Sequence, residues 1–161
     1  GTSDPLRFKD LSEESWNYVL ETNLNGAFRV AKMATDLMLK NKKGGSIINI
    51  ASILGQRVGL NLASYATSKS ALIQLTKSMA LELARSNIRV NALAPGYILT
   101  EINDDFFATE EGQNYIKKIP MNRLGLEEDL DGALLLLSSD ASSFMTGSVI
   151  NIDGGHLINP L

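Results

Sequence analysis

A tyrosine and a lysine stand four residues apart, at Tyr65 and Lys69, in the stretch SYATSKSALIQLTKSMALELA. The apolar spacing of this stretch predicts an amphipathic helix over residues 64–84, on which residues four apart lie side by side. A phenol next to an ammonium could transfer a proton to or from a substrate oxygen. Tyr-x-x-x-Lys alone occurs by chance in roughly one of three chains of this length, so a plain surface pair remains the alternative unless other groups join it.

Three further features place polar groups near this pair. Ser52 ends a predicted buried strand thirteen residues before Tyr65, where its hydroxyl can face a cleft. Asn23 lies inside a predicted helix, in TNLNGAF, where asparagine is a poor helix former unless its amide has a partner. The next strand ends in APGYILT, residues 94–100, which contains a tight Pro-Gly turn. If the strands are parallel, all these groups meet at the carboxyl edge of one sheet.

The segments that carry these residues alternate between two patterns. Near-continuous apolar, β-branched runs at residues 46–52, 88–96 and 147–155 predict strands that are covered on both faces. Helical patterns run from Ser12 to about residue 43, over 64–84 and over 127–139. This alternating order predicts an α/β fold with a parallel sheet and right-handed crossovers, in a single domain over residues 1–161. Residues 97–121 are the least regular and are predicted to form a lid, with a plain surface excursion as the alternative.

Composition excludes several kinds of function. The 161 residues are 44% hydrophobic with a formal net charge of -3, so neither nucleic acid nor a membrane is an expected partner. There is no cysteine and one histidine, His156, which is too few for a cysteine-based metal site or a histidine triad, and no metal is expected. The longest run of large apolar residues, 134–137, is far too short to cross a bilayer. These features predict a soluble cytoplasmic protein.

An ordered set of motifs resembles the short-chain dehydrogenase/reductase family. The motifs run in the family's order from about Phe8 to Gly155, and as a set with this spacing they are highly specific. The subgroup that they resemble most contains 3-oxoacyl-carrier-protein reductases and sugar-alcohol dehydrogenases. The matching stretches are TNLNGAF, GSIINIAS, YATSK, NIRVNALAPGYILT, RLGLEEDLDGALLLLSSDASSFMTG and INIDGG.

The resemblance implies a role for each matching residue. The catalytic group would be Asn23, Ser52, Tyr65 and Lys69. Tyr65 would exchange a proton with the substrate oxygen, Ser52 would hydrogen-bond that oxygen, and Lys69 would lower the pKa of Tyr65 and hold the nicotinamide ribose. Asn23 would anchor a water that relays protons to Lys69. The implied cofactor is NAD or NADP, bound by Tyr65, Lys69, Pro95, Gly96, Ile98 and Thr100.

One part of the family's cofactor site has no counterpart in this chain. The family binds the dinucleotide at a Gly-rich turn after the first strand, followed by a residue that selects NAD or NADP. Here the Gly-containing stretch NKKGGSI precedes a strand instead of following one. We therefore expect the C-terminal part of a Rossmann-like doubly wound parallel sheet, with the first βαβ units absent and an unpaired sheet edge beside Ile47, Ile48 and Ile50. Such a fragment is expected to be inactive alone.

Three functions are open at this point. The first is an NAD(P)-dependent oxidoreductase that interconverts a carbonyl and a secondary alcohol in a small molecule. The second is an epimerase or dehydratase that reuses the Tyr-Lys pair. The third is a non-catalytic oligomerisation module, because the resemblance implies a homo-oligomer, dimer or tetramer, formed through the helices around Asn23 and Tyr65. The substrate stays open, since the loop 53–64 offers Gln56 and Arg57 beside leucines; His156 is expected to be structural or exposed.

Overall fold

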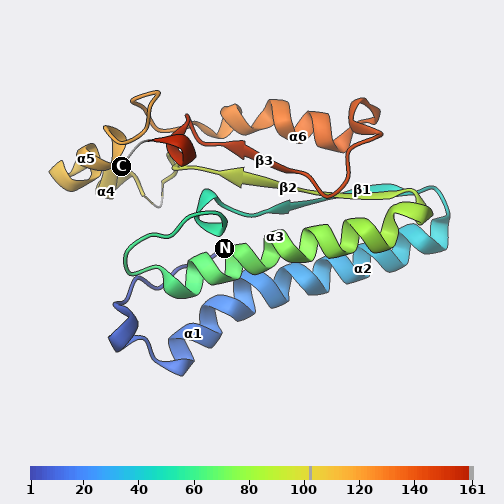
Figure 1. Ribbon diagram of the computed structural model, residues 1–161, viewed down its shortest axis with the longest axis horizontal. Helices are drawn as coiled ribbons and strands as arrows, with labels where there is room; N and C mark the ends of the chain where they lie inside the picture. Colours follow the sequence, from blue (N-terminus) through green and yellow to red (C-terminus); the bar gives the residue numbers. More distant parts are fainter. Residues whose placement is uncertain (102, 160–161) are drawn as a thin grey trace.

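A parallel three-stranded sheet forms the centre of the molecule. The computed structural model describes residues 1–101 and 103–159. Its strands are β1 (Gly45–Ile50), β2 (Ile88–Pro95) and β3 (Val149–Ile152), and they lie in the order β1-β2-β3 (Figure 1). Gly45 pairs with Ile88 and Ala92 with Val149, so all three strands run in the same direction. The predicted strands and the predicted parallel α/β fold are confirmed.

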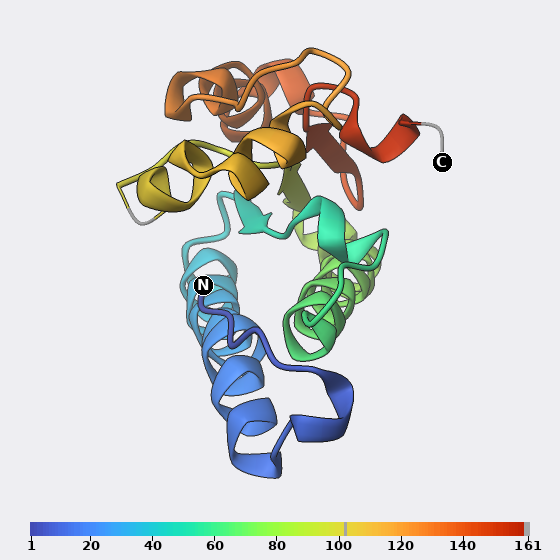
Figure 2. The same cartoon turned by 90° about the vertical axis from the view of Figure 1, so that its left-hand side faces the viewer.

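Helices cover both faces of this sheet. The chain passes from β1 to β2 through α3 (Ala63–Leu83) and from β2 to β3 through a segment that contains α6 (Asp131–Ser138). Figures 1 and 2 show α3 and α2 (Gly26–Asn41) together on one face, and α6 on the other. Both connections join parallel neighbours, and parallel neighbours need a crossover of this kind. The carboxyl ends of β1 and β2 therefore lie at the same edge of the sheet.

The first long helix is interrupted by a wider turn. Ser12 begins α1 (Glu13–Leu20), where its Oγ accepts a hydrogen bond from the Ser15 N–H at 3.1 Å. Residues Glu21–Asn25 then form a π-helical turn before α2 continues to Asn41. The sequence pattern predicted one uninterrupted helix here. An apolar pattern reports the face of a helix and does not detect one extra residue in a turn, so the π turn was missed.

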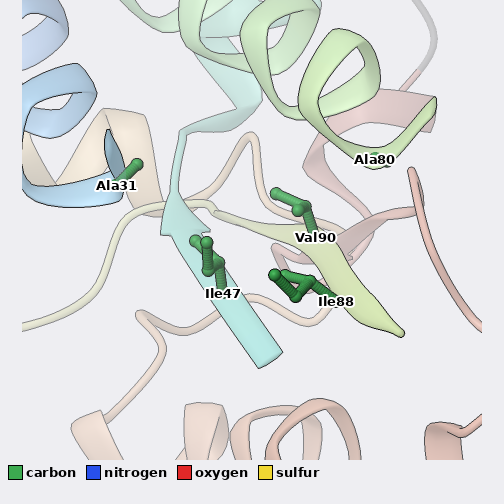
Figure 3. Packing of buried hydrophobic residues seen from close by; sticks show 5 residues of the cluster. All are labelled: Ala31, Ile47, Ala80, Ile88 and Val90. Atoms are coloured by element: carbon green, nitrogen blue, oxygen red, sulfur yellow. The ribbon is translucent and has the colours of Figure 1, made fainter. Parts of the chain in front are cut away.

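The main core lies between β1, β2 and the two helices that cover them. It contains Ala31 of α2, Ile47 of β1, Ala80 of α3, and Ile88 and Val90 of β2 (Figure 3). The strands supply the branched side chains and the helices supply alanine, so the helices approach the sheet closely. This packing holds α3 against the sheet and thereby fixes the position of its first turn.

The segment after β2 contains two short helices. They are α4 (Asp104–Ala108) and α5 (Glu110–Ile116), and within the segment Phe107 and Ile119 are buried. The predicted lid, residues 97–121, includes Ile102, which lies outside the described residues. The segment has regular structure, but whether it opens and closes stays a prediction.

The helix predicted over residues 127–139 begins differently from the prediction. Residues Glu127–Leu130 form a 3-10 turn, and α6 proper starts at Asp131. The carboxylate of Asp129 accepts hydrogen bonds from the Leu126 N–H at 2.8 Å and from Arg123 at 2.6 Å. These bonds turn the chain tightly just before α6, which explains the late start of the α-helix. Within the part of the chain that the structure describes, no helix has the length and apolarity needed to span a membrane.

One edge of the sheet is open. Within residues 1–101 and 103–159, β1 pairs with β2 alone, so its outer edge has no strand beside it. A groove of about 410 Å³ follows this edge and is bounded by α2; its apolar lining includes Val30, Met38, Ile48 and Ile50. The predicted unpaired edge beside Ile47, Ile48 and Ile50 is confirmed.

Candidate active site

Ser52 lies just beyond the end of β1. Its Oγ accepts a hydrogen bond from the Leu54 N–H at 3.1 Å, which caps the 3-10 turn Ile53–Gly55. The side chain is buried at the carboxyl edge of the sheet, as the sequence predicted. A hydroxyl held in this way has a fixed oxygen position and a proton that remains available for a second partner.

Tyr65 lies in the first turn of α3 and shares a cavity with Ser52. The cavity has a volume of about 390 Å³. It brings together four of the predicted site residues, Ser52, Tyr65, Gly96 and Ile98. The other residues around it are Gly1, Thr2, Ser3, Ile53, Leu54, Leu62, Tyr97 and Asn103. The predicted meeting of the β1 end, the start of α3 and the Pro-Gly turn is therefore present in the structure.

Three predicted cofactor residues do not line this cavity: Lys69, which lines the neighbouring groove, and Pro95 and Thr100. Pro95 is the last residue of β2, and Thr100 donates its backbone N–H to the Asn103 Oδ1 at 2.9 Å. Asn103 in turn donates its Nδ2 to the Ile98 carbonyl at 2.9 Å. Pro95 and Thr100 thus belong to the loop that shapes the cavity, and a direct cofactor contact from either stays a prediction.

Lys69 lies one turn after Tyr65 and is buried. Its Nζ donates a hydrogen bond to the Ile50 carbonyl at 2.8 Å and lies 5.7 Å from the centroid of the Tyr65 ring. It lines the groove beside β1, which adjoins the cavity that contains Tyr65. An ammonium has three hydrogens, so two remain for other partners. Lys69 is therefore a buried cation placed where the groove meets the cavity.

The electrostatics of the pair differ from the expectation. Burial raises the pKa of Tyr65, and the hydrogen bond with Ser52 opposes this rise. Burial also lowers the pKa of Lys69. The prediction that Lys69 lowers the pKa of Tyr65 is wrong for this structure. The ammonium is bonded to a backbone carbonyl and faces the ring, so its charge does not offset the loss of water around the phenol.

Asn23 lies in the π turn and is almost completely buried. Its Oδ1 accepts the Thr2 N–H at 2.7 Å, and its Nδ2 donates to the Thr2 carbonyl at 2.8 Å and to the Ser68 Oγ at 3.2 Å. The amide thus has the partners that its place in a helix required. π turns often occur at functional sites because the extra residue re-aims a side chain. The predicted water-anchoring role of Asn23 stays a prediction, because protein groups occupy its amide.

Tyr97 and His156 join the site without having been predicted as part of it. Tyr97 lines the cavity beside Tyr65, and the His156 ring lies 5.5 Å from the Tyr97 ring. His156 is buried, so of its two predicted states the structural one applies. Arg57 donates to the His156 carbonyl at 2.7 Å, which places the loop after Ser52 against the chain terminus. In the sequence, the feature that could have indicated Tyr97 as a site residue is its position directly after the Pro95–Gly96 turn.

The described residues contain no metal-binding cluster. Within residues 1–101 and 103–159, no three aspartate, glutamate or histidine side chains come close enough together to hold an ion. The polar groups at the carboxyl edge include the hydroxyls of Ser52 and Tyr65, the Lys69 ammonium and the Asn23 amide. This set suits proton transfer to or from an oxygen.

Known proteins resemble this chain over most of its length. Residues 1–156 match the family model described as enoyl-(acyl carrier protein) reductase. The 3-oxoacyl-[acyl-carrier-protein] reductase of Thermotoga maritima is 40% identical over 157 residues, which is 98% of this chain and 63% of that protein. The 2-dehydro-3-deoxy-D-gluconate 5-dehydrogenase of Bacillus subtilis is 42% identical over 92% of this chain and 59% of that protein.

A solved structure gives the same result for the fold. The gluconate 5-dehydrogenase of Burkholderia cenocepacia, in complex with NADP and tartrate, is 33% identical and has a TM-score of 0.92 over 97% of this chain and 61% of that one. The fold defines a Rossmann-like α/β protein. This chain belongs to the short-chain dehydrogenase/reductase family. It spans 63% and 59% of the two curated relatives described above.

Proposed function

We propose that this chain forms the catalytic part of an NAD(P)-dependent oxidoreductase that interconverts a carbonyl and a secondary alcohol in a small molecule. The observation that carries the proposal is the shared cavity of Ser52 and Tyr65, with Lys69 buried one turn behind. The names of the relatives, reductases and dehydrogenases acting on 3-oxoacyl and gluconate compounds, support the same reaction type.

In the reductive direction, Tyr65 donates its proton to the carbonyl oxygen of the substrate. Ser52 donates a hydrogen bond to the same oxygen, and this bond strengthens as negative charge develops there. A phenol with the usual pKa of about 10 is protonated at neutral pH and has a proton to donate. Burial raises the pKa of Tyr65 further, which makes its hydroxyl a weaker acid in this structure. A nicotinamide cofactor held in this site would supply the hydride that the carbonyl carbon accepts. Hydride and proton together convert the carbonyl into the alcohol, and the reverse direction uses the same groups.

The residues present fit the nicotinamide end of such a cofactor. Lys69 has two hydrogens beyond its bond to Ile50, and it lies beside the cavity, where ribose hydroxyls would accept them. Gly96 and Ile98 line the same cavity. The Burkholderia cenocepacia relative binds NADP. We therefore propose NAD or NADP as the cofactor, held by Tyr65, Lys69 and the loop after β2.

The open edge of β1 supports a further part of the proposal. We propose that the three strands are the C-terminal part of a doubly wound sheet, and that βαβ units with a Gly-rich turn complete it along β1. The groove beside this edge is lined by apolar side chains of α2 and β1, as the face of an incomplete sheet would be. Without these units the dinucleotide has no Gly-rich turn to bind, and the chain alone is expected to be inactive.

A fusion protein tests these proposals together. The N-terminal part of the Thermotoga maritima reductase, up to the residue that aligns with Gly1, is joined to the N-terminus of this chain. We expect the fusion to bind NADPH or NADH and to oxidise it when a 3-oxo ester is added. With 2-dehydro-3-deoxy-D-gluconate, whose C5 hydroxyl is the group that a 5-dehydrogenase oxidises, we expect it to reduce NADP or NAD instead. The same fusion with Tyr65→Phe should bind the cofactor and lose turnover.

The outcomes separate the remaining alternatives. Product formation without net change in cofactor absorbance would favour the epimerase or dehydratase. A folded fusion that binds neither cofactor nor substrate would overturn the oxidoreductase and leave the oligomerisation module. Turnover that survives Tyr65→Phe unchanged would remove Tyr65 from the reaction.

Self-association is proposed as well. α2 exposes large apolar side chains, namely Phe28, Val30, Met33 and Leu37. Exposed apolar patches of this kind mark interaction sites. We propose a homo-oligomer, dimer or tetramer, that uses the helices around Asn23 and Tyr65. Sedimentation equilibrium of the fusion checks this, and a monomer at micromolar concentration would contradict it.

A further inference from the structure

Tyr97 forms part of the wall between two cavities. It follows the Pro95–Gly96 turn and lines the cavity that contains Ser52 and Tyr65. It also lines a second cavity of about 190 Å³, on the side of Ile119, Met121 and Arg123. Ile98 is the other residue that lines both. A smaller side chain at position 97 would therefore join the two cavities into one longer space.

Three aromatic rings hold the Tyr97 ring in place. Phe107 meets it edge to face with 5.7 Å between centroids, and Tyr115 does the same at 5.9 Å. The His156 ring lies tilted against it at 5.5 Å. Edge-to-face contacts of this kind are favourable and directional. Tyr97 is thus a fixed part of the wall, and its ring has neighbours from both the segment after β2 and the end of the chain.

His156 is itself held rigidly behind Tyr97. Its backbone N–H donates to the Asp153 carbonyl at 3.1 Å, and its carbonyl accepts from Arg57 at 2.7 Å. The Asp153 carboxylate accepts the N–H groups of Gly155 at 2.9 Å and Leu157 at 2.8 Å. Among the described residues the buried His156 Nδ1 has no hydrogen-bond partner. A buried nitrogen without a hydrogen-bond partner lowers the stability of the fold. The contact of the His156 ring with the Tyr97 ring is a reason to have this side chain here despite that cost.

We propose that Tyr97 sets a length limit on the substrate, so that the site takes compact polar carbonyl compounds and excludes those with long apolar tails. The inference rests on the proposed function and names the substrate class of that same site. A tail that extends from the reacting carbon toward Ile119 and Met121 meets the Tyr97 ring. Burial is the main cause that raises the pKa of Tyr97, so its hydroxyl remains protonated and can donate to a polar substrate.

A substrate series tests this limit in the fusion protein described above. The probes are 2-dehydro-3-deoxy-D-gluconate, as the compact compound, and 3-oxo methyl esters lengthened by two carbons at a time. In Tyr97→Ala the ratio of kcat/KM for the longest over the shortest ester should rise by about tenfold or more, since each added methylene in an apolar pocket carries a factor of about ten. Tyr97→Phe should keep the length limit and raise KM for the compact polar compound, with kcat little changed.

Matched variants separate a positioning effect from a loss of folding. Tyr97→Leu keeps an apolar side chain and should give a length profile between those of the parent and of Tyr97→Ala. This variant replaces Tyr97→Ala in the test if the alanine variant is unstable. Phe144→Ala removes an exposed ring that adjoins the start of β2, at the far ends of the strands, and should leave the profile unchanged. His156→Ala removes one neighbour of the ring and should loosen the limit less than Tyr97→Ala does.

Binding provides a readout that does not depend on turnover. In the Tyr65→Phe background, calorimetric titration with the longest ester should show tighter binding after Tyr97→Ala than before. Equal affinity for the longest ester before and after Tyr97→Ala would overturn the length limit. A change in kcat/KM by the same factor for all esters would overturn it as well. A fusion that binds esters in this length-dependent way but never turns them over would overturn the proposed oxidoreductase and leave the role of Tyr97 standing.

Discussion

The Lys69 ammonium lies over the ring of Tyr65 and is bonded to the last residue of β1. The Lys69 Nζ is 5.7 Å from the centroid of the Tyr65 ring and is bonded to the Ile50 carbonyl at 2.8 Å. The ammonium therefore connects α3 to the end of β1, while the Tyr65 hydroxyl has Ser52 as its hydrogen-bonding neighbour. Lys69 lines the groove beside β1 and Tyr65 lines the adjoining cavity. This arrangement supports the proposal that Tyr65 is the acid and that Lys69 binds the cofactor.

Tyr65→Phe in the fusion should lower kcat by about 100-fold to 10,000-fold, the usual contribution of a positioned general acid. The ring stays in place, so the far-UV circular dichroism and the cofactor affinity should stay close to those of the parent. Tyr18→Phe is the matched control, because the Tyr18 side chain is exposed on α1. A Tyr18 variant with an equal loss of kcat would argue against a specific role for Tyr65.

Asn23→Ala should lower the free energy of unfolding by about 1–3 kcal/mol, because it leaves the Thr2 backbone groups and the Ser68 hydroxyl without their buried partner. Urea denaturation measures this loss, and amide exchange at Thr2 should become faster in the variant. Asn25→Ala is the control within the same π turn, since Asn25 is exposed and bonds only to the Glu21 carboxylate. Equal destabilisation by both substitutions would show that the turn, and not the Asn23 amide, carries the effect.

Stability should fall as the pH falls through about 6.5 because of His156. It is the single histidine of the sequence, and burial followed by the nearby charge of Arg57 lowers its pKa from 6.5. Between the folded-state pKa and 6.5 the unfolded chain binds more protons than the folded chain, so protonation favours unfolding there. His156→Gln should remove this part of the pH dependence.

Urea midpoints at about pH 7.5 and about pH 5.5 check this, since both values lie above the range of most carboxylates. The parent should lose more stability between the two than the Gln variant does. If both lose the same amount, another group is responsible for the change.

Ile48→Lys should reduce self-association of the chain alone. Ile48 lies on β1 at the groove beside its open edge, and a charge at a strand edge disfavours pairing with another strand. Sedimentation velocity at several concentrations should show a smaller weight-average sedimentation coefficient than the parent. Phe144→Lys adds the same charge at an exposed position outside the helices proposed for self-association and should not change the distribution. An equal or larger effect from Phe144→Lys would argue against a contact at the edge of β1.

Much of the fold followed from local patterns in the sequence. The three strands, the helix that carries Tyr65 and the parallel order could be predicted because apolar runs and helical spacing report which faces are covered. The meeting of Ser52, Tyr65 and Gly96 followed from topology, since parallel strands bring their carboxyl ends to one edge. The open edge of β1 followed from the missing Gly-rich turn, and the structure confirmed that edge.

The tertiary structure alone decided how these groups face one another. The pattern Tyr-x-x-x-Lys placed Tyr65 and Lys69 on one helix face. In the structure, Lys69 donates a hydrogen bond to the Ile50 carbonyl, which joins α3 to β1 and fixes the direction of the ammonium. Burial raises the pKa of the Tyr65 phenol. The contact of His156 with Tyr97 joins residues far apart in the chain. Such contacts depend on how elements pack, and burial then sets the electrostatics. The sequence by itself therefore determined which groups meet, and packing determined what each of them can do.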